Sequence, residues 1–185
     1  PAGPVDPGPA GPPPPLAAHL SGPPPGHTGG FGEPTCRICH EGDPLNAYGG
    51  SVRILGLPTA YRPGGSYAVS VVLEASGTAV AGFQLAARFE GGTARGRAAG
   101  RVEPMDPRVA VTVGEDGQPY AHHTVDGTAP TGPDGSQWIL TWTAPAGGGT
   151  VVFHVASNSG NGDNSPLMDL IYTARAEVAA APPGG

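Results

Sequence analysis

Cys36 and Cys39, the two cysteines of this 185-residue chain, stand two residues apart, and His40 follows directly. The C-x-x-C-H pattern is typical of covalent c-type haem attachment, in which each thiol adds to a haem vinyl group and the histidine becomes the proximal iron ligand. Two intervening residues let both sulfurs reach one edge of the porphyrin while the next side chain is directed at the iron. We therefore interpret Cys36 and Cys39 as thioether positions and His40 as the proximal ligand of one haem c.

Two other chemistries use the same residue types. The cysteines could form a disulfide or a dithiol redox pair, or they could supply half of a zinc site completed by His27, His40 or a carboxylate. A thioredoxin-type pair belongs between a strand and a helix, and a structural zinc usually recruits a second pair of cysteines; the sequence indicates neither. Both readings stay open as alternatives to haem.

The elements that must position this segment are strands. Short runs that are rich in β-branched residues or alternate with period two follow residue 51, separated by turn sequences such as "RPGG", "GEDGQ" and "GPDGS". The expected strands cover residues 51–57, 66–75, 81–89, 108–113, 137–145, 150–157 and 170–178. Trp138 and Trp142 lie four apart on one of them, hence on one face, and are expected in the core. Seven or more such strands predict an immunoglobulin-like antiparallel β-sandwich.

Composition narrows the possible functions. The chain has 32 Gly, 24 Pro and a formal charge of -6, and all nine of its cationic Lys and Arg residues are arginine, so a surface that tracks phosphates is not expected and nucleic acid is excluded as a partner. No apolar run reaches the roughly 18 to 20 residues that a membrane span requires. We find no nucleophile elbow and no phosphate-binding glycine motif, so the expected protein is not an enzyme.

The expected organisation has four parts. Residues 1–30, with 11 Pro and 7 Gly, predict an extended tail; residues 31–50 form the haem-attachment segment; residues 51–179 form the sandwich; and residues 180–185 form a C-terminal tail. Because the chain starts at Pro1 without methionine, we expect an exported protein that has lost its signal peptide. The segment "SNSGNGDNS" at 157–165 offers oxygens that could suit calcium, but it lacks acidic density and is expected to be a turn.

Several motifs, in this order, carry a resemblance to a known family. They are "HTGGFGEPTCRICHEGDP" from residue 27, "GFQLAARF", "AHHT", "WILTWTAP", "VVFHVASNSGNGD" and "IYTARAEV". The resemblance covers about residues 26–178. The chain resembles the bacterial Reeler-like family often called the choice-of-anchor V domain. Many members carry a cysteine pair plus histidine before the first strand, as Cys36, Cys39 and His40 stand here. The resemblance implies an exported β-sandwich with a haem packed on it.

The sixth iron ligand decides what such a haem does, because a second protein ligand closes the iron and favours electron transfer. In the Reeler-like pattern a histidine followed by Thr or Ser precedes the tryptophan strand, and His123 matches it, so His123 is our first expectation. His122 would face the other way along an extended segment. The alternatives are Met105, Met168, His122 and His19. His154 is expected to pack on the sandwich and His27 to neighbour the iron ligands.

These observations predict a monohaem c-type cytochrome that passes single electrons within a larger periplasmic or extracellular assembly. We expect that assembly to be a respiratory or photosynthetic complex or a haem polymer. The expected partners are other electron-transfer subunits or further copies of the chain, and they would bind through the N-terminal tail. The alternative is an extracellular binding or assembly module whose C-x-x-C-H segment holds a metal or a disulfide. A third reading is a five-coordinate haem that binds a small gas.

Overall fold

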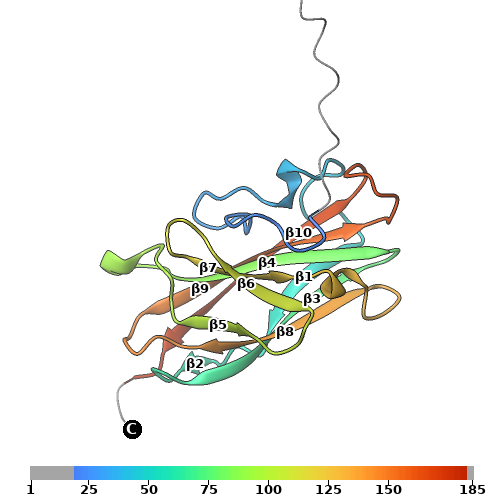
Figure 1. Ribbon diagram of the computed structural model, residues 1–185. Coiled ribbons are helices and arrows are strands. Elements are labelled where there is room, and N and C mark those ends of the chain that lie inside the picture. The colour runs from blue at the N-terminus through green and yellow to red at the C-terminus, as the bar shows by residue number, and fades with distance from the viewer. Residues whose placement is uncertain (1–18, 183–185) are drawn as a thin grey trace, which may run out of the picture.

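The computed structural model describes residues 19–182 and confirms a two-layered, all-β sandwich (Figure 1). One sheet has the strand order β1-β3-β8-β5 and the other the order β2-β10-β9-β4-β7-β6. Neighbouring strands are antiparallel except β2 and β10, which are parallel. The strands are β1 (Gly50–Leu55), β2 (Ala60–Tyr61), β3 (Ser66–Ala75), β4 (Val80–Phe89), β5 (Arg101–Pro104), β6 (Val109–Val113), β7 (Pro119–His123), β8 (Gly135–Thr143), β9 (Thr150–Gly160) and β10 (Leu170–Ala180).

All seven strands expected from the sequence are present, although their bounds shift by a few residues. Three strands were not anticipated: β2, β5 and β7, which have 2, 4 and 5 residues. Three turns of 3-10 helix, η1 (Cys36–Ile38), η2 (Gly92–Ala94) and η3 (Asp126–Thr128), complete the secondary structure. Within residues 19–182 no helix is long and apolar enough to span a membrane.

The core lies between the two sheets and is built around the tryptophan strand β8. Trp138 and Trp142 are both fully buried, as the sequence predicted. Trp138 stacks at a tilt on Phe83 of β4, with ring centroids 4.7 Å apart, and Trp142 meets Phe153 of β9 edge-on at 4.9 Å. Because these rings come from both sheets, they hold the layers together.

Strand β4 is buried on both of its faces. Phe83 and Leu85 point into the core, while the alternate residues Gln84, Ala86 and Arg88 lie on the outer face, yet they are only 0%, 1% and 3% exposed. Residues 19–42, called here the cover segment, lie across this outer face, and Figure 1 shows them above β4 and β10. Residues 19–30 therefore lie on the sandwich, whereas the sequence assigned them to an extended tail; residues 1–18 are outside the described part.

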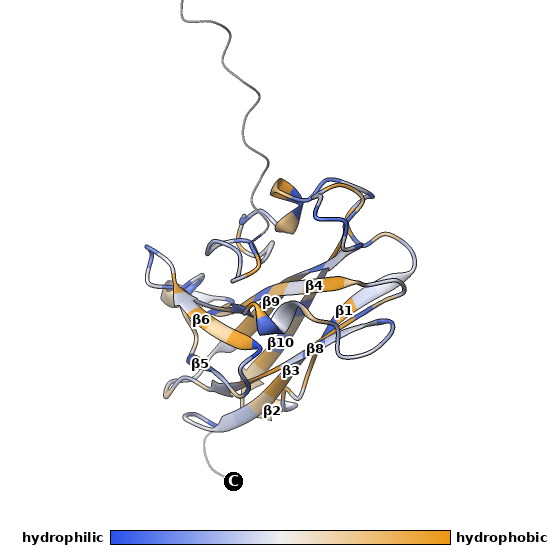
Figure 2. Cartoon of the chain, turned by 45° about the vertical axis from the view of Figure 1, so that its right-hand side comes forward, coloured by the Kyte–Doolittle hydropathy of each residue, from blue (hydrophilic) through white to orange (hydrophobic). Residues whose placement is uncertain are grey.

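The connection from β9 to β10 forms the other border of this surface. Strand β9 continues to Gly160, so the expected turn at 157–165 begins later, and residues 161–169 form the loop. Glu41 at the end of the cover segment forms a parallel bridge with Leu167 in that loop. Figure 2 shows the largely hydrophilic loops that gather at this end of the sandwich, with the apolar residues of η1 among them.

Candidate functional site

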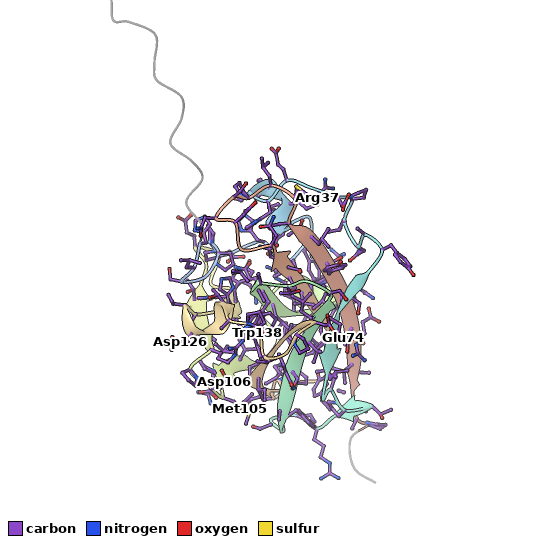
Figure 3. All side chains as sticks on the ribbon, turned by 90° about the vertical axis from the view of Figure 1, so that its right-hand side faces the viewer. Arg37, Glu74, Met105, Asp106, Asp126 and Trp138 are labelled. Carbon is purple, nitrogen blue, oxygen red and sulfur yellow. The ribbon has the colours of Figure 1, made fainter. Side chains whose placement is uncertain are left out.

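The turn η1 brings the two thiols and the imidazole of the C-x-x-C-H segment to one side. The Thr35 side chain caps the turn by accepting a hydrogen bond from the Arg37 amide, and the amides of Cys39 and His40 both donate to the Cys36 carbonyl, at 3.2 and 3.0 Å. Arg37 is exposed and lies near the top of the molecule in the view of Figure 3. This tight turn fixes the relative positions of Cys36, Cys39 and His40.

A buried carboxylate holds the His40 ring. Nδ1 of His40 lies 2.6 Å from Oδ2 of Asp169, which is 4% exposed, and donates to it when His40 is in the Nδ1–H form. The Asn158 amide nitrogen lies 3.3 Å from the same carboxylate oxygen. A histidine whose Nδ1–H is bound by a carboxylate leaves Nε2 available, which is the usual arrangement of a metal-ligating histidine.

These residues line a pocket between the cover segment and the sheet. Its walls come from the cover segment, from β4 and β9, and from the loop 161–169. The cavity between them has a volume of about 130 Å³ and is partly open to solvent. The residues that line it include His19, Leu20, Pro24, His27, Cys36, Ile38, Cys39, His40, Gly82, Phe83, His123, Asn158 and Asp169. The pocket therefore combines both thiols, four histidines and an apolar wall.

Three of the expected ligands, His122, Met105 and Met168, lie outside this lining, whereas His19 and His123 are part of it. His122 and His154 do not line the pocket, and Met105 and Met168 are 54% and 77% exposed. In Figure 3 Met105 lies at the opposite end of the molecule from Arg37 of η1. His154 instead meets Phe31 edge-on, with ring centroids 5.5 Å apart, as the packing role expected for it requires.

His123 lines the pocket, but both of its ring nitrogens are within hydrogen-bond distance of the backbone. Nδ1 accepts from the Phe83 amide at 3.0 Å, and Nε2 donates to the His19 carbonyl at 3.0 Å. Burial lowers the pKa of His123, and one neutral tautomer satisfies both bonds. Iron ligation by His123 stays a prediction, and it would require one of these bonds to break.

The cover segment is fastened to β4 by a buried ion pair. Arg88 pairs with Glu33, and the Tyr120 hydroxyl lies 2.6 Å from each of them. Thr28 donates to the same carboxylate. Burial by itself would raise the pKa of Glu33, but hydrogen bonds from Arg88, Thr28 and Tyr120, together with the Arg88 charge, lower it. Glu33 therefore remains ionised and anchors the residues just before η1.

The two thiols are not joined by a disulfide in this structure. Burial of the Cys36 thiol raises its pKa to about 12, which keeps it protonated at neutral pH. Across the described residues, no three His, Cys, Asp or Glu side chains lie close enough to hold a single metal ion.

Three residues of the site were not anticipated from the sequence: Glu33, Gln84 and Asp169. Asn158 was considered only within the 157–165 segment, as a possible oxygen donor to calcium. Asp169 lies 129 positions from His40, and no local pattern connects the two. Gln84 gave a usable signal, because a long amide in the middle of an otherwise apolar strand indicates a buried hydrogen-bonding partner.

Comparisons with known proteins support the fold. The Reelin-N domain of F-spondin is similar, with a TM-score of 0.51 and 20% identity over 80% of this chain and 96% of that domain. The human F-spondin reeler domain gives 0.50 and 22% over 78% of this chain and 99% of its own length. A cohesin module from a Clostridium perfringens family 33 glycoside hydrolase gives 0.50 and 13%, over 71% and 96%.

The chain is therefore a Reeler-like β-sandwich, as the resemblance implied. At these identities the likeness extends to the fold alone. No protein-family model and no curated protein matches the chain.

Proposed function

We propose that the protein is a monohaem c-type cytochrome that transfers single electrons. The observation that carries the proposal is the convergence of Cys36, Cys39 and His40 on one pocket, with Nδ1 of His40 held by the buried Asp169. A histidine on an exposed loop, with no ligand to bind, would not need a buried carboxylate to orient its ring. Here the ring is oriented with Nε2 left available for a metal, as iron ligation requires.

The residues of the pocket fit a haem in two respects. The two thiols are unpaired and stand on one turn. Leu20, Pro24 and Ile38 give the pocket an apolar wall for the macrocycle.

The roles of the side chains follow from this arrangement. Cys36 and Cys39 would hold the haem through thioethers, and His40 would ligate the iron. Bound there, a haem supplies an iron that takes up and releases one electron. Asp169 fixes the tautomer and the orientation of His40 and increases the donor strength of its Nε2. The cover segment supplies one wall of the pocket.

The proposed setting is an exported electron-transfer assembly, in which the protein exchanges electrons with other subunits or with further copies of itself. The N-terminal tail is the proposed docking arm, and its residues 1–18 lie outside the described structure. The assembly would be a respiratory or photosynthetic complex or a haem polymer.

The test is a reduced pyridine haemochrome spectrum of the full chain, produced with export and haem-ligation machinery, after acid-acetone extraction. A c-type band that survives extraction supports the proposal, and Cys36→Ala with Cys39→Ala should abolish it while the sandwich stays folded. If no band survives although a known cytochrome made in parallel is loaded, the proposal fails. The alternative is then a binding or assembly module, to be examined by metal analysis and a thiol count.

A further inference from the structure

His27 is the best-positioned histidine of the pocket that the proposed function leaves unused. Its ring Nδ1 lies 2.9 Å from the Pro24 carbonyl, which can only accept, so Nδ1 carries the proton and Nε2 has a lone pair. Nε2 has no hydrogen-bond partner among residues 19–182, and His27 lines the pocket. This is the tautomer, and the backbone contact, that typically orients a metal-ligating histidine.

The backbone around His27 is fixed by the sheet below it. The His27 amide donates to the Gln84 side-chain oxygen at 2.6 Å, and the Gln84 side-chain nitrogen donates to the Pro24 carbonyl at 2.8 Å. Gln84 is fully buried. One glutamine thus bridges both ends of the turn that carries His27 and holds the acceptor that orients its ring.

The sheet register places His27 near His40. His27 is anchored on Gln84, and His40 lies beside Asn158, which pairs with Gly82. Because Asn158 lies on β9 and Gln84 on the neighbouring strand β4, the two anchor points differ by one strand, about 5 Å, and by two residues, about 7 Å, along the strands. Both imidazoles belong to the cover side of the same sheet, and each presents an Nε2 that its Nδ1 contact leaves available.

The two other pocket histidines are less suited to bind a metal. His123 uses both ring nitrogens for backbone hydrogen bonds. The His19 side chain is exposed, and among the described residues neither of its ring nitrogens has a hydrogen-bond partner that would orient the ring. A ligand that is already oriented loses less conformational entropy when it binds.

We propose that His27 is the sixth ligand of the haem iron, giving bis-histidine coordination by His27 and His40. The proposal rests on the proposed haem function. It assigns to Gln84 the role of a positioning residue, which acts through His27. Bis-histidine ligation closes the iron to small gases and sets a lower reduction potential than a methionine ligand would.

The experiment compares His27→Ala with His19→Ala and His123→Gln in the full, haem-loaded chain. The readouts are the low-spin signal in electron paramagnetic resonance, and carbon monoxide binding to the reduced protein. We expect His27→Ala to lose the low-spin signal, to bind carbon monoxide, and to regain the low-spin signal with added imidazole. The other two variants should keep the wild-type signal. The pyridine haemochrome yield checks haem attachment separately in each.

His27→Met gives a second measurement that does not depend on the alanine variant folding. It should remain low-spin, gain a methionine–iron charge-transfer band and have a raised midpoint potential, because methionine ligation raises it. The proposal is overturned if His27→Ala keeps the low-spin signal, and loss of that signal in His19→Ala or His123→Gln would then identify the ligand. It is also overturned if the wild-type protein, with covalent haem present, is already high-spin and binds carbon monoxide. Absence of covalent haem from the wild type refutes the haem function itself and is distinguishable from both.

Discussion

Replacing Glu33 with glutamine removes the carboxylate that pairs with Arg88 beneath the cover segment. The two side chains are 14% and 4% exposed, so the Arg88 guanidinium would stay buried with its charge uncompensated. Losing one partner of a buried ion pair costs about 3 to 5 kcal/mol. Glutamine keeps one acceptor of the carboxylate, so we expect a loss of about 3 kcal/mol in the free energy that holds the cover segment on the sheet.

A matched control lies in the exposed pair Arg53 and Glu74, whose side chains are 50% and 58% exposed. Glu74→Gln should change the free energy of unfolding by less than about 1 kcal/mol, because water screens a surface pair. The two variants therefore compare the same chemical change at a buried site and at an exposed one.

Two assays locate the loss. Urea unfolding followed by tryptophan fluorescence reports on the core, and hydrogen exchange at Gly29 and Gly30 reports on the cover segment. If the segment detaches locally, a loss of about 3 kcal/mol accelerates exchange there roughly 150-fold, with the core transition unchanged. If Glu33→Gln and Glu74→Gln behave alike in both assays, the ion pair does not hold the segment and our reasoning is wrong.

The effect should also depend on pH. The pKa of Glu33 is lowered from its ordinary value of 4.5, so the folded state binds a proton less readily than the unfolded state. The stabilisation is therefore fully present above about pH 4.5 and is lost as the pH falls through the folded-state pKa. The difference between wild type and Glu33→Gln should be constant near neutral pH and shrink in acid.

Three further changes test other parts of the site. Asp169→Asn should raise the midpoint potential of the haem-loaded protein by about 60 mV, a tenfold change in the reduction equilibrium, because a neutral amide weakens electron donation from His40; redox titration measures it. Gly30→Ala would place a Cβ 2.4 Å from the His154 ring and should destabilise the cover segment by about 1 to 3 kcal/mol, as measured by hydrogen exchange. Gly32→Ala is the control for the added methyl group, because its Cβ meets no atom within 4 Å. The positive φ of Gly32 adds backbone strain of its own to that control. In haem-free protein at pH 8, iodoacetamide should modify Cys36 far more slowly than in the urea-unfolded chain, because burial raises its pKa to about 12; mass spectrometry follows the reaction.

The fold was largely predictable because period-two patterns mark strands that have one buried face. The short strands β2, β5 and β7 were not predicted from the sequence, for a physical reason. With 2 and 4 residues, β2 and β5 show too few alternations to be distinguished from loops. Strand β7 is as long as the predicted β6, but it is buried on both faces and therefore has no alternation of apolar and polar residues. The tail boundary was misplaced because glycine and proline content alone does not show whether a segment packs on a sheet: residues 24–30 are rich in both and are bonded to β4. Hydrogen bonds to Gln84 and Arg88, far along the chain, keep residues 24–33 in place.

The candidate site also has a part that the sequence predicts and a part that only the fold brings together. The spacing of Cys36, Cys39 and His40 is local and could be read directly. The partners of these residues are not local: Asp169 reaches His40 only because the 161–169 loop bridges to the end of the cover segment. His123 was favoured on a sequence pattern, while the hydrogen bonds that engage its ring depend on the folded backbone of Phe83 and His19.

The surface beneath the cover segment has a consequence for how such a site could arise. The outer face of β4 carries Gly82, Gln84 and Ala86, and small or polar residues of this kind expose little apolar area if the cover segment is detached. The sandwich core lies on the other face, and none of its buried residues comes from the cover segment. A Reeler-like sandwich could therefore gain or lose this site through the exchange of one contiguous stretch before its first strand, with few changes elsewhere. Evolution could in this way add the proposed haem site to an existing scaffold without redesigning its interior.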